Sequence, residues 1–155
     1  MQTHVGPEFK RLLVAVDGSD NAARAAKVAV TLAEKFGAEL IVCHVIPTPS
    51  YSFAQAGMVG PATILGDYFA AARKDAKKVV DEAVRLAEME GVKAIGVIRD
   101  NVFSAVEAIV NLAEDRNVDL IVIGTRGLTG FRRLLIGSVS SGVVSHAHCS
   151  VFLVR

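Results

Sequence analysis

The strongest constraint on the fold of this chain is a set of short apolar runs separated by segments of helical periodicity. The runs occur at residues 11–16, 39–45, 92–98, 119–124 and 150–154. Each is too short to cross a membrane, and near-continuous Val, Ile, Leu and Ala is typical of strands that are covered on both faces of a parallel sheet. The sequence therefore predicts five buried strands, of which the third is the weakest.

The segments between these runs carry apolar residues at helical spacing. Alanines recur every three or four residues from Ala22 to Ala33, and Gly37 follows as a stop signal. The same spacing predicts a long helix over residues 67–90, which ends at Gly91. The first half of the chain thus alternates strand and helix.

Two shorter helices are predicted in the second half of the chain. Ser104 and Glu107 form a capping box at the start of one, and residues 138–147 make the other. Residues 46–66, by contrast, are rich in Pro, Gly, Ser and Ala and show no period. A loop of this length inside a compact domain is usually functional or mobile, so we expect one of these roles for it.

Strands that alternate with helices imply a parallel sheet with right-handed crossovers. We expect a single doubly wound α/β domain over residues 1–155, Rossmann-like, with strand order 3-2-1-4-5 and helices on both faces. Such folds bind ligands beyond the carboxyl ends of the strands, where the winding reverses. Here that point lies between strands one and four, so Asp17 and its neighbours are expected to face the loop that starts at Gly124.

Composition narrows the class of protein. Hydrophobic residues make up 52% of the chain and the mean hydropathy is +0.42, yet no apolar stretch reaches the roughly 18 residues of a spanning helix. The first residues lack a signal-peptide core, so we expect a cytoplasmic protein without membrane contact. A net charge of +1 argues against general nucleic-acid binding. Cys43 and Cys149 are expected to be buried apolar residues rather than a metal or redox pair.

Residues 124–140 form the stretch with the clearest chemical content. Glycines let the backbone approach a ligand closely, and the unpaired amides at the start of the helix from Ser138 favour an anion. A phosphate chain across Gly127 and Gly137 is one interpretation, and a Gly-rich turn with ordinary capping serines is the other. The spacing matches neither the Walker loop nor the dinucleotide fingerprint.

The chain resembles the universal stress protein family in this stretch. Gly124-x-x-Gly127, nine residues and then Gly137-Ser138 reproduce the G-x-x-G-x9-G-S pattern of the ATP-binding members. The resemblance extends to Asp17 after the first strand, to the run 43–46, to the run 118–124, and to nearly all of residues 10–155. Two departures are the absence of a common glycine within 98–103 and Ser150 in place of a common proline.

The resemblance implies a site for an adenine nucleotide. Asp17 would lie near the ribose and adenine, with a turn aspartate that caps the next helix as the alternative. Val45 would pack on adenine, and Arg126 is either a phosphate ligand or a solvated side chain. His44 is expected in the core or at the rim rather than as a catalyst. The implied set is Ala15, Val16, Asp17, Val45, Ile123, Gly124, Arg126, Gly127, Gly137, Ser138, Val139 and Ser140.

The function implied by the resemblance is that of an ATP-binding stress-response sensor or regulator with at most slow ATP hydrolysis. AMP and cyclic AMP remain open as ligands, and Mg²⁺ or Mn²⁺ would accompany a triphosphate. Family members form homodimers through the last strand, and residues 151–154 would otherwise be an exposed apolar edge. The alternatives are a dimeric interaction module that binds no nucleotide, and a slow ATPase, for which the sequence offers no convincing general base.

Overall fold

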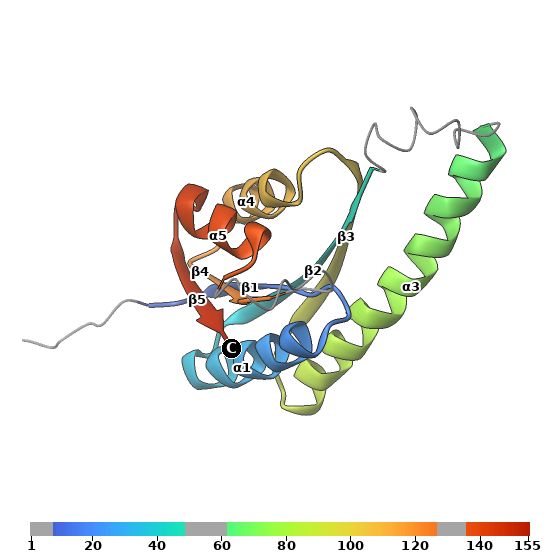
Figure 1. Cartoon of the computed structure of the whole chain (residues 1–155). Coiled ribbons are helices and arrows are strands. Elements are labelled where there is room, and N and C mark those ends of the chain that lie inside the picture. The colour runs from blue at the N-terminus through green and yellow to red at the C-terminus, as the bar shows by residue number, and fades with distance from the viewer. Residues whose placement is uncertain (1–7, 49–61, 127–135) are drawn as a thin grey trace, which may run out of the picture.

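The computed structural model of the protein describes residues 8–48, 62–126 and 136–155. It contains five parallel strands in one sheet of order β3-β2-β1-β4-β5, as predicted, with helices on both faces (Figure 1). The strands are β1 (Arg11–Ala15), β2 (Glu39–Pro47), β3 (Ala94–Val102), β4 (Leu120–Gly124) and β5 (Ser150–Val154). The helices are α1 (Asp20–Phe36), α3 (Ala62–Met89), α4 (Ala105–Asp115) and α5 (Ser138–His146).

The largest differences from the predicted boundaries lie in β2, β3 and α3. β2 continues to Pro47 and β3 to Val102 because the two strands stay paired across an irregularity, and the pairing tolerates polar side chains on the edge strand β3. α3 begins at Ala62, five residues before the predicted start, since the residues there are compatible with a helix although they show no strong period. The predicted loop is therefore shorter at both ends, and residues 49–61 lie outside the described part.

The core consists of two apolar layers, one on each face of the sheet. Leu12 and Val14 of β1 pack toward α1 and α3, whereas Leu13 between them packs toward α4 and α5. This alternation follows from the two-residue period of a strand. Cys43 is buried as predicted, but Cys149 is only half-buried, because β5 is an edge strand and covers its neighbourhood incompletely.

Serine side chains cap the starts of α1 and α4, and of these two caps the one at Ser104 is predicted by the sequence. Ser19 precedes α1, and its Oγ accepts a hydrogen bond from the amide of Ala22 at 3.1 Å. Gly37 ends α1 in the left-handed conformation with φ of 64°, which glycine adopts without steric cost. Ser104 Oγ likewise accepts from the Glu107 amide at 3.2 Å at the start of α4. Within the described ranges, no helix combines the length and hydropathy needed to cross a membrane.

Candidate functional site

A cavity of about 780 Å³ opens at the carboxyl end of the sheet, where the winding reverses. β1 pairs with β2 on one side and with β4 on the other, and the chain leaves β1 and β4 toward different faces. The divergence of these connections leaves a crevice, as in other doubly wound folds. The volume lies within the range of small-molecule sites.

Eleven of the twelve residues expected in the site line this cavity. They come from the ends of β1, β2 and β4 and from the start of α5, elements that are far apart in the sequence. The eleven are Ala15, Val16, Asp17, Val45, Ile123, Gly124, Arg126, Gly137, Ser138, Val139 and Ser140. Gly127 lies outside the described residues. The structure thus brings eleven of the expected residues together at one cavity.

Gly124 brings the end of β4 into direct contact with the first turn of α1. A Cβ atom at this position would lie 3.1 Å from the backbone carbonyl of Asn21, a distance that real side chains rarely tolerate. The glycine is therefore required by a close backbone approach rather than by its own dihedral angles. This contact holds the end of β4 close to α1 beside the cavity.

The start of α5 forms the wall of the cavity beside β4. Gly137 precedes the helix in an extended conformation and supplies no side-chain cap, so the first amides of α5 lack this partner. Ser140 is buried, and its hydroxyl donates a hydrogen bond of 2.6 Å to the carbonyl of Gly124. The Ser140 proton is thus already used to hold α5 against β4, which leaves Ser138 and the helix amides as donors for a ligand.

Asp17 lies in the turn that follows β1 and also at the wall of the cavity. Its Oδ1 accepts a hydrogen bond from the amide of Ser19 at 2.9 Å, which stabilises the turn between β1 and α1. The same residue lines the cavity. The interpretation as a turn aspartate is therefore confirmed, but the expected cap is wrong, because Ser19 and not Asp17 caps α1. The turn contact does not remove Asp17 from the cavity.

His44 lies at the wall of the cavity, in agreement with the expected core or rim position. Burial lowers the pKa of the imidazole, whereas the Asp17 carboxylate and a backbone contact with Val16 act in the opposite direction. The Nδ1 atom is buried and has no hydrogen-bond partner within the described part of the chain. The neutral imidazole is therefore favoured, with one ring nitrogen unsatisfied.

α3 provides one wall of the cavity, which was not predicted from the sequence. Tyr68, Ala72, Asp75, Ala76 and Val79 line the cavity from this helix. The sequence places Ala72, Ala76 and Val79 on one face of the helix predicted over residues 67–90, without assigning this face to the cavity. The available signal was that this face continues toward the start of the helix, beyond the length that a sheet of this size covers.

Two further expectations concern metals and the end of β3. Among the residues that the structure describes, no three His, Cys, Asp or Glu side chains gather as a metal site. Residues 98–103, where family members often carry a glycine, do not line the cavity. Asn101 adopts a positive φ of 53° there, a conformation that Asn tolerates better than most residues.

Fold and cavity together define a class, the doubly wound α/β proteins with a small-molecule pocket where the winding reverses. Within this class, the model of the universal stress protein family matches residues 8–155. The chain belongs to the universal stress protein family.

Individual relatives agree with this assignment. A universal stress protein of Thermus aquaticus is 38% identical over 152 residues, with 95% of this chain and 99% of the relative covered. One of Methanocaldococcus jannaschii is 34% identical over 149 residues, with 95% and 82% covered. The structure of the universal stress protein UspA from Lactobacillus plantarum superposes with a TM-score of 0.85 at 27% identity and covers 97% of this chain and 100% of its own.

Two proteins of the same fold were solved with nucleotides. A universal stress protein from Archaeoglobus fulgidus in complex with dAMP has a TM-score of 0.67 at 23% identity, with 96% of this chain and all of that chain covered. A universal stress protein in complex with cAMP has a TM-score of 0.66 at 24% identity, with 96% and 98% covered. Because both identities are below 25%, these two structures are evidence for the shared fold alone.

Proposed function

We propose that this chain binds an adenine nucleotide, ATP in the first place, in the cavity at the carboxyl end of the sheet. It acts as a stress-response sensor or regulator with at most slow hydrolysis. The observation that carries the proposal is the start of α5, whose uncapped amides share one cavity with the apolar ends of β1, β2 and β4. An anionic group and a flat apolar group can therefore be bound by one site.

The phosphate end of the ligand is assigned to Gly137, Ser138 and Arg126. A helix amino terminus presents unpaired amides and a positive dipole, both of which favour a phosphate. Gly137 keeps this approach open, because a Cβ atom there would lie 3.2 Å from the Thr125 carbonyl oxygen and beside the cavity. Ser138 adds a hydroxyl donor, and Arg126 adds a positive charge at the same wall.

The base and ribose are assigned to the ends of the strands. Ala15, Val45 and Ile123 supply small apolar surfaces at the edge where the cavity opens. Such surfaces suit an aromatic base, which is held mainly by packing. The dAMP and cAMP complexes of proteins with this fold agree with the ligand class.

Hydrolysis is expected to be slow. A general base needs a free acceptor that is aligned on the attacking water. Asp17 spends one carboxylate oxygen on the Ser19 amide, and His44 has no hydrogen-bond partner for Nδ1 in the described residues that would orient it as a base. A triphosphate would bring its own Mg²⁺ or Mn²⁺, held mainly by phosphate oxygens. The corresponding location in the cell is the cytoplasm.

A homodimer through β5 is part of the proposal. Within the described residues, β5 is an edge strand that pairs only with β4, and Phe152 in its middle is 44% exposed. Exposed apolar edges favour pairing with another strand, and a second copy of β5 is self-complementary about a twofold axis. Gel filtration with light scattering is expected to give twice the chain mass, and a clean monomer would contradict the dimer.

The decisive experiment is calorimetric titration of nucleotide-stripped protein with magnesium ATP. We expect one site per chain in the parent protein and loss of at least about a hundredfold in affinity in Gly137→Val, because the side chain crowds Thr125 and fills the phosphate position. Gly66→Val is the matched control, since no atom lies within 4 Å of a Cβ atom at this position. An absence of heat with ATP, AMP and cyclic AMP would replace the proposal with a dimeric interaction module.

A further inference from the structure

We propose that α3 is the wall that covers the base of the bound nucleotide, and that the Tyr68 ring stacks on the base. The inference rests on the nucleotide site proposed above and adds a binding residue outside the glycine pattern.

α3 is longer than the sheet it covers. Its 28 residues extend about 42 Å, whereas the nine residues of β2 or β3 extend about 30 Å. Figure 1 shows that the C-terminal half of α3 packs on the sheet and that the helix diverges from β2 and β3 toward its N-terminal end. The first turns of the helix therefore stand beyond the part of the sheet they would otherwise pack on.

One apolar stripe runs along the whole of α3 but is buried over only part of it. Ala76, Val80, Ala83 and Ala87 lie on the stripe and are buried in the core. Tyr68, two turns earlier on the same stripe, is 45% exposed and lines the cavity. A stripe that faces core at one end and cavity at the other is explained if a ligand covers its second end.

The contacts of Tyr68 and its neighbours hold this part of α3 in place. Arg73 forms an ion pair with Asp100 of β3 and lies over the Phe69 ring at 5.9 Å. The Phe69 and Tyr68 rings meet edge to face with centroids 5.4 Å apart. The Phe69 ring thus supports the Tyr68 ring from one side. Because its position is already restricted, the Tyr68 side chain loses little conformational freedom when a ligand stacks on it.

The charges around the cavity select the orientation of the ligand. The wall at α5 suits an anion, whereas the cavity is also lined by the carboxylates of Asp17 and of Asp75 of α3, of which Asp75 forms a long, exposed ion pair with Lys78 at 3.8 Å. Gly18, next to Asp17, approaches Val79 of α3, which places the β1–α1 turn against this helix. Phosphates are repelled from two carboxylates, and a neutral base with an exocyclic amine is not. The base is therefore directed toward α3 and its aromatic ring.

The test separates the two ends of the ligand. Nucleotide-stripped parent, Tyr68→Ala and Tyr68→Phe are titrated with ATP, adenosine and tripolyphosphate. Stacking on an aromatic ring contributes enough that Tyr68→Ala is expected to weaken ATP and adenosine about tenfold, with tripolyphosphate unchanged and Tyr68→Phe close to the parent. Leu65→Ala is the matched control, because Leu65 is also exposed on α3 but does not line the cavity.

A second measurement uses the unmodified chain and does not depend on the folding of a variant. Adenosine is expected to slow hydrogen exchange at the amides of residues 68–76, whereas tripolyphosphate leaves them unchanged. Equal ATP and adenosine affinity in Tyr68→Ala and the parent, or no protection of these amides by adenosine, overturns the role of α3. If the parent binds none of the three probes, the nucleotide site itself is wrong.

Discussion

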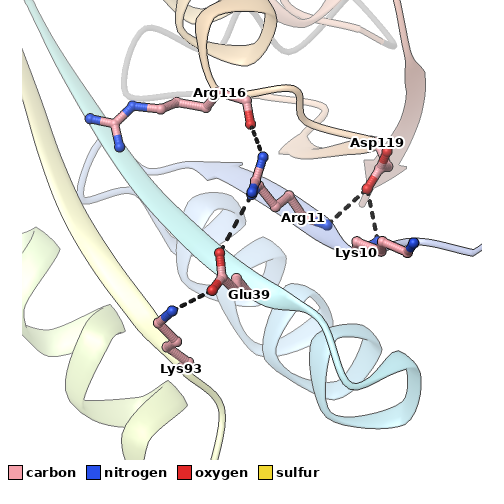
Figure 2. Close-up of polar contacts among 6 residues, drawn as sticks. All are labelled: Lys10, Arg11, Glu39, Lys93, Arg116 and Asp119. Atoms are coloured by element: carbon pink, nitrogen blue, oxygen red, sulfur yellow. Dashed lines mark hydrogen bonds and ion pairs between the residues drawn. The ribbon is translucent and has the colours of Figure 1, made fainter.

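The two ends of the same sheet differ in how their polar groups are used. At the amino end, the Asp119 carboxylate accepts hydrogen bonds from the amides of Lys10 and Arg11 at 2.8 and 2.9 Å (Figure 2). The Arg11 side chain donates to the carbonyl of Arg116 at 2.9 Å. At the carboxyl end, the amides that start α5 have no side-chain cap, and a cavity takes the place of such contacts.

Glu39 shows the pattern at the amino end most clearly. It lies between Arg11 and Lys93 and so connects β1, β2 and β3 (Figure 2). The charged groups there bind one another and leave a small hollow of about 300 Å³ among them. The amino end of the sheet therefore satisfies its polar groups internally, whereas the carboxyl end keeps donors that a ligand can use. Function at such sites is commonly obtained at a cost in stability.

The largest expected effect is the increase in the free energy of unfolding when nucleotide binds at the carboxyl end of the sheet. In the parent, nucleotide at a hundred times its dissociation constant is expected to add about 2.7 kcal/mol to the free energy of unfolding. Gly124→Val is expected to remove this gain and to destabilise the unliganded protein by about 1–3 kcal/mol, because its side chain collides with the Asn21 backbone. Thermal unfolding with and without ATP measures both. A normal ATP shift in Gly124→Val would show that the contact between β4 and α1 does not shape the site.

The second prediction applies the same measurement to the amino end. Asp119→Ala removes the acceptor for two backbone amides and is expected to lower the free energy of unfolding by about 1–2 kcal/mol. Its ATP-induced shift is expected to equal that of the parent, because the two ends do not share contacts. Asp115→Ala is the control, since among the described residues that carboxylate makes a long, exposed ion pair of 3.8 Å with Arg99. A changed nucleotide affinity in Asp119→Ala would show that the amino end of the sheet influences nucleotide binding at the carboxyl end.

A smaller effect concerns the helix that overhangs the cavity. Gly66→Ala is expected to stabilise the protein by about 0.5–1 kcal/mol, because alanine favours the helix and a Cβ atom there meets nothing within 4 Å. Urea unfolding monitored by circular dichroism measures the change. Gly37→Ala is expected to destabilise the protein instead, since the φ of 64° at this position disfavours a side chain. No gain in Gly66→Ala would indicate that the start of α3 is not helical in the unliganded protein.

The sequence predicted the sheet order because each strand is a separate apolar run and each crossover has a fixed hand. It also predicted which residues meet at the carboxyl end, since strand ends and the start of a helix follow directly from the boundaries. The predicted bounds of β5, Ser150 and Val154, agree with the structure at both ends. These features depend on short segments of chain and on topology.

The missed wall depends instead on a distance between elements. Whether Ala72 and Ala76 face core or cavity is decided by how far α3 extends past the sheet, and the stripe looks the same in both cases. The role of the Ser140 hydroxyl could not be predicted either, because its acceptor, the Gly124 carbonyl, is 16 positions away and is brought close only by the packing of α5 on β4. Local patterns fix elements, and packing decides what faces the ligand.

The smallest expected effect tests the ion pairs at the amino end by pH. The hydrogen bond and charge of Lys93, with Arg11 as a further partner, lower the pKa of Glu39 below its ordinary value of 4.5. A lowered pKa in the folded state means that the contribution is present above pH 4.5 and is lost as the pH falls below it. Glu39→Gln should therefore unfold at a slightly lower temperature than the parent at pH 7, and the difference should shrink at pH 3 and in high salt. A difference that is independent of pH and salt would mean that Glu39 acts through packing, and that charge pairing does not distinguish the amino end from the carboxyl end.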